Sequence, residues 1–199
     1  MKLLKKAFAF TFIFMLSVSG LTGYQVNASE EQKHLDILFT HDLHSHLNSF
    51  QTIVDGTQQE TGGFARLKTL INEHEKENTD TLILDGGDFS MGTLIQTVYD
   101  TESAELRMLG YLGCDVTTLG NHEFDYGSDG LADMLNAAVS SGENLPRMVV
   151  CNVDWDAMKK AGFSEGQKQI YEAFQTYGVK DYTVIQKGDV KIAVPVSYT

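Results

Sequence analysis

Three short runs of the sequence combine the residue types that bind divalent metals and transfer protons. Asp42-Leu43-His44, Gly87-Asp88 and the run GNHEFD from Gly120 to Asp125 each follow an apolar stretch of the length of a β-strand. Carboxylate and amide oxygens with imidazole nitrogens, without thiolate, favour Mn, Zn, Mg or Fe over copper. The pattern predicts a metal centre at converging strand ends, with candidate side chains Asp42, His44, Asp88, Asn121, His122 and Asp125.

The first two runs predict the ligands. Asp42 and His44 are two residues apart, and residues i and i+2 of extended backbone face the same way, so the pair could share one ion. Gly86 and Gly87 permit a tight turn before Asp88, whose two carboxylate oxygens could bridge two cations.

The third run predicts acid–base chemistry beside a further ligand, the amide oxygen of Asn121. Two divalent ions about 3.5–4 Å apart generate a hydroxide and neutralise phosphoryl oxygens during in-line displacement. His122 would protonate the leaving oxygen or stabilise developing charge, and Asp125 would hold its imidazole in one tautomer. Singly, the runs are as consistent with a solvated turn, a plain loop and a helix N-terminus. Their joint appearance at strand ends favours a site.

From residue 35 to residue 194 the chain resembles the 5′-nucleotidase family of calcineurin-like metallophosphoesterases. The resemblance rests on THDLHSH (40–46), GGFAR (62–66), LDGGDF (84–89), MGT (91–93) and LGNHEFDYG (119–127). It implies a calcineurin-like α/β core and metal-dependent hydrolysis of nucleotide phosphate esters. It also implies that Asp42, His44, Asp88 and Asn121 bind two metal ions, with Asp88 bridging, and that His122 and Asp125 are the catalytic pair.

The chain departs from the family in three respects. His41 stands where the family commonly has Asn, either as a tolerated change or as an extra ligand. His46 is expected at the rim of the site. The family takes further ligands from a later His and a Gly-His-x-His or Gly-His-x-Gln segment, but residues 123–199 contain no His. We therefore expect an incomplete second metal site.

The end of the sequence suggests a fragment. Pro195 follows the predicted strand Val190–Val194, and Pro is a poor choice inside a central strand. Either the reading frame departs from the ancestral one here, by frameshift, early stop or an incomplete gene model, or an edge strand simply ends. We expect residues 29–199 to be the N-terminal part of a metallophosphoesterase domain, inactive alone, with the C-terminal nucleotide-binding domain absent.

Strand and helix patterns alternate along the chain and predict an α/β fold, a mainly parallel sheet flanked by helices and incomplete at its C-terminus. Ligands bind at the carboxyl ends of strands in such sheets. The predicted strands are 35–40, 81–84, 114–119 and 147–153, with a hairpin of 182–186 and 190–194. The predicted helices are 63–77, one through Leu106, Leu109 and Leu112 closed by Gly113, 128–140 and 167–177.

Residues 1–28 read as a signal peptide, with Lys2, Lys5 and Lys6 before an apolar run and small residues near Ala28. An uncleaved anchor is the alternative. The prediction is export to a secreted, periplasmic or cell-surface location, without stable membrane insertion after cleavage. The formal net charge of −12 disfavours binding of nucleic acid polymers. The expected substrate is a small nucleotide or nucleotide-sugar.

The two cysteines, Cys114 and Cys151, are expected to be buried free thiols, because their positions on neighbouring parallel strands are offset too far for a disulfide.

The leading interpretation is a secreted metal-dependent phosphohydrolase of the 5′-nucleotidase type. The alternatives are a catalytically incompetent secreted fragment and a relative that cleaves 2′,3′-cyclic nucleotides or UDP-sugars.

Overall fold

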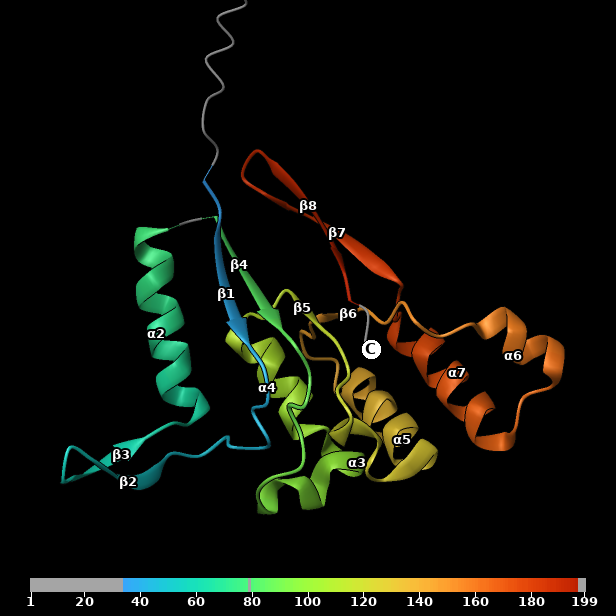
Figure 1. Cartoon of the computed structure of the whole chain (residues 1–199), viewed down its shortest axis with the longest axis horizontal. Coiled ribbons are helices and arrows are strands. Elements are labelled where there is room, and N and C mark those ends of the chain that lie inside the picture. The colour runs from blue at the N-terminus through green and yellow to red at the C-terminus, as the bar shows by residue number, and fades with distance from the viewer. Residues whose placement is uncertain (1–33, 79, 197–199) are drawn as a thin grey trace, which may run out of the picture. The chain divides into compact units, whose positions relative to one another are not determined.

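The computed structural model describes residues 34–78 and 80–196. Its central sheet has four parallel strands in the order β1–β4–β5–β6, several of which lie side by side in Figure 1. Because the strands are parallel, their carboxyl ends meet at one edge of the sheet. The predicted α/β fold is therefore confirmed, with the strands β1 Asp36–Thr40, β4 Thr81–Asp85, β5 Val116–Thr117 and β6 Arg147–Met148.

Helices connect the strands and agree with the sequence prediction to within two residues where one was made. Gly113, with a φ of 92°, ends the helix through Leu112 as predicted. The helical segments are α2 (Phe64–Glu77), η1 (Leu94–Val98), α3 (Tyr99–Glu102), α4 (Ala104–Leu112), η2 (His122–Phe124), α5 (Gly127–Ser140), α6 (Trp155–Ala161) and α7 (Glu165–Tyr177).

The core lies on both faces of the sheet, as the central strand β4 illustrates. Ile83 packs into a large cluster with buried residues of the helices, such as Ile71. Leu82 points into a second cluster that includes Ile185 and Val194. These two residues belong to the predicted antiparallel hairpin, β7 (Tyr182–Lys187) and β8 (Val190–Pro195). Burial on both faces explains why β4 is a continuous apolar run.

One hairpin and several short helical segments escaped the sequence analysis. The strands β2 (Phe50–Val54) and β3 (Thr57–Thr61) form an antiparallel hairpin. Asp55 and Gly56 turn it with φ values of 51° and 75°, and an Asp-Gly pair between β-forming runs is a strong hairpin signal that could have been used. The missed helical segments are η1, α3, η2 and α6. The first turn of α6 is capped by the Asp154 side chain.

Both cysteines are free, as predicted, but only Cys114 is buried. Burial raises the pKa of the Cys114 thiol. The expectation of a second buried thiol was wrong, because β6 ends at Met148 and leaves Cys151 exposed in the connection beyond the sheet. There its Sγ donates to the carbonyl of Val196 at 2.8 Å.

The predicted signal peptide, residues 1–28, lies outside the described residues. Within the described ranges, no helix has the length and apolar character needed to cross a bilayer.

A buried carboxylate joins three strands close to the carboxyl edge of the sheet. Asp85 of β4 accepts hydrogen bonds from the hydroxyl of Thr40 in β1 at 2.9 Å and from that of Thr117 in β5 at 2.8 Å. The backbone N–H of Gly87 also donates to it, at 3.1 Å. Desolvation nevertheless raises the pKa of Asp85 to about 6.

This raised pKa predicts a pH-dependent stability. Between the ordinary value of 3.8 and about 6, the folded chain keeps a proton that the unfolded chain loses, so the free energy of unfolding falls as pH rises through this window. The loss is on the order of 3 kcal/mol. In urea unfolding with EDTA, the stability of Asp85→Asn relative to wild type should rise by this amount from pH 4 to pH 7. A pH-independent difference would contradict the prediction.

Candidate metal centre

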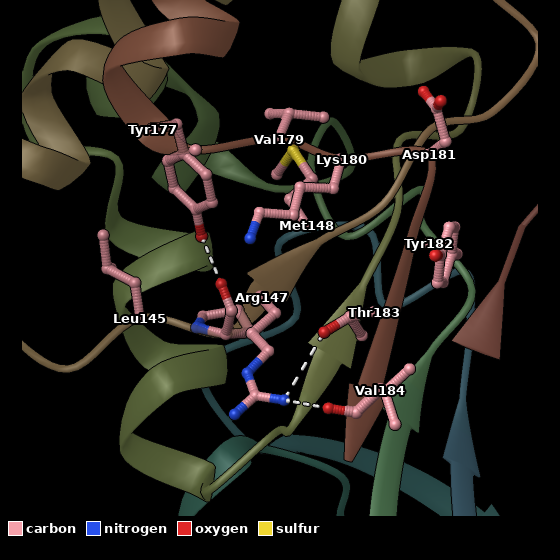
Figure 2. A pocket seen from close by; sticks show the side chains of 12 residues that line it. Leu145, Arg147, Met148, Tyr177, Val179, Lys180, Asp181, Tyr182, Thr183 and Val184 are labelled. Atoms are coloured by element: carbon pink, nitrogen blue, oxygen red, sulfur yellow. Dashed lines mark hydrogen bonds between the residues drawn. The ribbon is translucent and has the colours of Figure 1, made fainter. Parts of the chain in front are cut away.

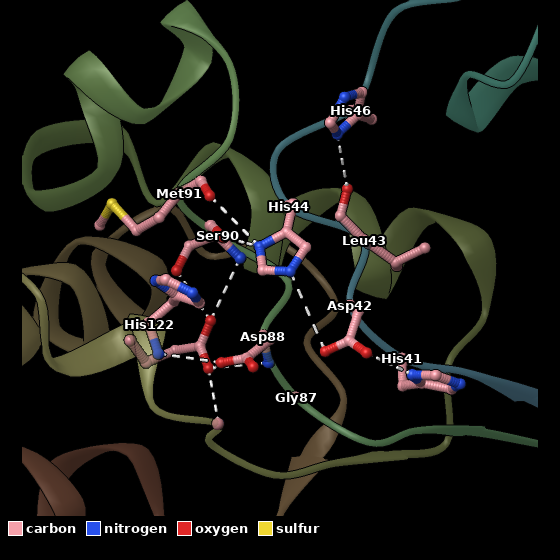
Figure 3. Close-up of polar contacts among 12 residues, drawn as sticks. His41, Asp42, Leu43, His44, His46, Gly87, Asp88, Ser90, Met91 and His122 are labelled. Carbon is pink, nitrogen blue, oxygen red and sulfur yellow. Dashed lines mark hydrogen bonds and ion pairs between the residues drawn. The ribbon is translucent and has the colours of Figure 1, made fainter.

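The loops that follow β1, β4 and β5 meet at the carboxyl edge of the sheet. His44, Asp88 and His122, one from each loop, place one ligand atom each within 4.8 Å of one another. Figure 3 shows these side chains grouped together, with Asp42 beside His44. In the described part of the chain, this is the group of His, Cys, Asp and Glu side chains with the geometry to hold a metal ion.

The loop after β1 is turned, and the expectation of extended backbone there was wrong. Asp42, His44 and Ser45 have φ values of 53°, 45° and 53°. The backbone N–H groups of Asp42 and His44 donate to the carbonyls of Gly87 and Asp88, at 3.0 and 3.1 Å. Asp42 Oδ1 still lies 4.0 Å from His44 Nε2. The turn, and not strand alternation, brings these two side chains together.

The hydrogen bonds of His44 leave one ring nitrogen for a ligand role. Its Nδ1 lies 3.2 Å from each of the backbone carbonyl oxygens of Ser90 and Met91. A carbonyl only accepts, so Nδ1 carries the proton and Nε2 keeps its lone pair. A ring N–H held by a carbonyl is the usual support of a metal-binding histidine.

Asp88 and Asn121 present oxygen atoms to the same space. Asp88 Oδ1 accepts from the backbone N–H of His122 at 2.9 Å. In one orientation of the Asn121 amide, its oxygen faces Asp88 Oδ2 at 3.2 Å, which places two acceptors together. In the other, the amide nitrogen donates to the same atom. The amide oxygen then accepts from the backbone N–H of His122 at 3.2 Å. Carboxylate and amide oxygens are ligand types that divalent ions take, so the chemistry of this donor set fits a divalent ion.

His122 and Asp125 form a pair at the edge of the cluster. His122 Nδ1 lies 2.7 Å from Asp125 Oδ2, and this hydrogen bond is the main cause of a raised His122 pKa. The rings of His122 and His44 contact each other edge to face, with centroids 5.0 Å apart. Asp125 thus contacts the His122 imidazole, and the catalytic role of the pair stays a prediction.

Two other histidines lie beside the cluster. His41 is exposed, and its Nδ1 lies 2.7 Å from Asp42 Oδ2, a bond that lowers the pKa of Asp42. His46 turns away: its Nδ1 lies 3.3 Å from the Leu43 carbonyl, and its ring contacts Phe50. Figure 3 shows both outside the His44–His122 space.

Glu123 is the functional candidate that the sequence analysis missed. The side chain is fully buried, and its carboxylate accepts hydrogen bonds from Asp88, Ser90 and Gly120. Burial raises its pKa in spite of these bonds. The position within GNHEFD was visible, but two of its three partners, Asp88 and Ser90, lie 35 and 33 residues away along the chain, so no local pattern reveals them.

Two glycines let the second and third loops approach each other. A Cβ at Gly87, where φ is 87°, would lie 2.5 Å from the backbone nitrogen of Gly120. A Cβ at Gly120 would lie 2.1 Å from Asp88 Oδ1. Larger residues at either position would separate the loops that carry the candidate ligands.

A large cavity lies away from this chemistry. Its volume is about 920 Å³, and it is bounded by β6, the end of α7 and β7. Figure 2 shows Arg147 crossing it to Thr183 and the Val184 carbonyl, and Tyr177 donating to the carbonyl of Pro146. A smaller hollow of about 300 Å³ is lined by Asn121 and apolar neighbours. The candidate ligands therefore sit at a loop edge and not in the larger cavity.

The family model of calcineurin-like phosphoesterases matches residues 35–189. The chain belongs to this family. The matched span includes every candidate residue of the centre and agrees with the resemblance seen in the sequence motifs.

Relatives of this phosphoesterase chain include 5′-nucleotidases. It is 42% identical to mouse 5′-nucleotidase over 126 residues, which is 61% of this chain and 21% of the mouse protein. It is 33% identical to the NAD 5′-nucleotidase of Haemophilus influenzae over 133 residues, 65% of this chain and 22% of that protein. The chain thus spans about a fifth of the length of these relatives.

Solved structures of nucleotidases share the fold of this chain. The 5′-nucleotidase precursor from Thermus thermophilus aligns with a TM-score of 0.64 at 26% identity, over 82% of this chain and 28% of that one. The NAD nucleotidase of Haemophilus influenzae aligns with a TM-score of 0.59 at 26% identity, over 82% and 26%. The phosphoesterase fold is therefore shared over most of this chain.

The close approach at Gly120 predicts that Gly120→Ala damages the centre. The added Cβ must displace Asp88, so we expect a loss of about 1–3 kcal/mol in the free energy of unfolding and about tenfold weaker Mn²⁺ binding. Gly86→Ala is the matched control. Its Cβ would meet the ring of Phe39 at 2.9 Å and the Cβ of His41 at 3.1 Å, and both of these residues are exposed and can move. Equal losses in the two variants, in urea unfolding and Mn²⁺ titration, would contradict this argument.

Proposed function

We propose that the chain is a metal-dependent phosphohydrolase of the 5′-nucleotidase type that acts on phosphate esters of nucleotides. The observation that carries the proposal is the grouping of His44, Asp88 and His122, from three separate loops, within 4.8 Å. The names of the 5′-nucleotidase relatives support the substrate class.

In this proposal Asp42, His44, Asp88 and Asn121 would hold two divalent ions, Zn, Mn, Mg or Fe, with Asp88 shared as the resemblance implies. The free Nε2 of His44 and the position of the Asn121 amide, 3.2 Å from Asp88 Oδ2, support these roles. The partial exposure of Asp42 leaves the cluster open on the side where a substrate would approach.

The bound ions supply activation of water and neutralisation of phosphoryl charge. The residues of the chain do the rest. His122 donates a proton to the leaving oxygen or stabilises its developing charge. Asp125 holds the His122 ring through Nδ1, so that Nε2 is the atom available to the substrate.

The second candidate function is metal binding without turnover. The observation that favours it is the absence of histidine from residues 123–199. Asp88 and Asn121 are then the ligands that this chain offers to a second ion, and such a site binds weakly. In this case the chain holds one ion and needs further ligands, on a longer polypeptide, for catalysis.

Substrate range and location complete the proposal. Cyclic nucleotides and nucleotide-sugars are the alternative substrates, and the acidic balance of the chain disfavours nucleic acid polymers. We propose export through residues 1–28, on the strength of their basic start and apolar run. The Thermus thermophilus neighbour is itself described as a precursor.

Release of phosphate from AMP tests the proposed function. Any phosphate that wild type releases should depend on Mn²⁺ and stop with EDTA. Asp88→Ala should lower Mn²⁺ affinity and turnover by more than about 100-fold, the upper end of the effect of residues that only orient a ligand. Asp129→Ala, at an exposed carboxylate of α5, is the control and should behave as wild type.

Two outcomes would revise the assignment. Metal-dependent turnover that survives in Asp88→Ala would contradict the site. Wild-type protein that binds Mn²⁺ through Asp88 but releases nothing from AMP, 2′,3′-cyclic AMP or UDP-glucose would support the non-catalytic candidate.

Asp125→Asn separates orientation of the acid–base group from metal binding. Because Asp125 contacts His122 Nδ1 at 2.7 Å, the variant should lose about 10- to 100-fold in kcat while Mn²⁺ affinity stays within about twofold. Asp129→Asn is its control. An unchanged kcat for AMP would show that the pair has no part in turnover.

A further inference from the structure

One carboxylate, that of Glu123, accepts four hydrogen bonds and is fully buried. Its Oε2 accepts from the backbone N–H groups of Gly120 at 2.6 Å and Asp88 at 3.0 Å. Its Oε1 accepts from the backbone N–H of Ser90 at 3.1 Å and from the Ser90 hydroxyl at 2.7 Å. All four donors are neutral, so the bonds fix position more than they balance charge.

These bonds span a gap that the sheet does not close. The strands β4 and β5 pair through Leu84 and Val116, several residues before Asp88 and Asn121. Beyond that point, Glu123 links the loop that carries Asp88 to the loop that carries Asn121. It also holds Asp88 in a left-handed conformation, with a φ of 52°, which costs a non-glycine residue on the order of 1–3 kcal/mol.

The backbone of Glu123 is fixed as well. The Tyr99 hydroxyl donates to the Glu123 carbonyl at 2.7 Å, and both groups are buried. Glu123 is therefore held at its backbone by Tyr99 of α3 and at its side chain by the loop after β4. The residue fixes the loop after β4 relative to η2 and α3.

From this geometry we propose that Glu123 is a positioning residue of the metal centre: its carboxylate sets metal affinity by fixing Asp88 relative to Asn121. The inference rests on the proposed function, because it assumes that these two residues are ligands. Glu123 acts through them and touches neither metal nor substrate.

The four donors make the role specific for a carboxylate. Glutamine has one acceptor oxygen and one NH₂ group. In either orientation, the NH₂ of Glu123→Gln faces backbone N–H donors, those of Asp88 and Gly120 or that of Ser90. The variant must therefore break bonds on one side and shift a loop.

The test measures Mn²⁺ affinity and amide hydrogen exchange in wild type, Glu123→Gln, Ser90→Ala and Tyr177→Phe. Tyr177→Phe is the control for lost stability, because it removes a hydrogen bond to Pro146 that lies by the cavity of Figure 2, away from the cluster. Glu123→Gln should bind Mn²⁺ at least about tenfold more weakly, and the amides of Asp88, Ser90 and Gly120 should exchange faster. Tyr177→Phe should keep wild-type affinity and exchange at these amides.

Ser90→Ala removes one donor and keeps the backbone, so it decides the matter if Glu123→Gln does not fold. We expect it to bind Mn²⁺ about threefold more weakly than Tyr177→Phe, less than the roughly 10- to 100-fold loss for a whole orienting group, because three of the four hydrogen bonds to Glu123 remain. The inference would be overturned if the folded variants at Glu123 and Ser90 showed the same Mn²⁺ affinity and the same amide protection from hydrogen exchange as Tyr177→Phe. Mn²⁺ binding that depends on Glu123 in a chain that hydrolyses no ester would leave the inference standing and reject only the proposed function. Wild type that binds no Mn²⁺ would overturn both.

Discussion

The buried carboxylate of Glu123 is the interaction on which the geometry of the centre depends. A parallel sheet brings strand ends to one edge, but it does not fix the loops beyond them. Here the loops after β4 and β5 are held by the hydrogen bonds that Glu123 accepts from Asp88, Ser90 and Gly120. Three consecutive residues thus have three different roles: Asn121 is a candidate ligand, His122 is the candidate acid–base group, and Glu123 holds the loops together.

The loops are held in conformations that most residues avoid. Asp42, His44, Ser45, Asp88 and Met91 all have positive φ, each at a cost on the order of 1–3 kcal/mol. Backbone hydrogen bonds from the first loop to the second and the close approach allowed by glycine offset this strain. A second buried glutamate, Glu105, accepts from the Ser45 hydroxyl at 2.6 Å and secures the first loop. Strain gathered at one edge is typical of a preorganised site.

The alternation of strands and helices was readable because burial leaves a periodic apolar pattern, and the strand-end positions of the candidate residues followed from it. The turn at Asp42 and His44 could not be predicted from the sequence, because left-handed backbone dihedrals do not change the periodic pattern of hydrophobic residues. The role of Glu123 depends on contacts with residues distant in the chain, which a single sequence does not encode locally. The hairpin turned by Asp55 and Gly56, in contrast, carried a usable signal that was passed over.

The central claim is that the three loops form one metal centre. A crystal structure of the chain grown with Mn²⁺, with anomalous difference maps recorded at the manganese edge, tests it most directly. We expect a peak in contact with His44 Nε2 and the Asp88 carboxylate, with Glu123 hydrogen-bonded to Asp88, Ser90 and Gly120. Anomalous density elsewhere, with these side chains free of metal in a folded chain, would contradict it.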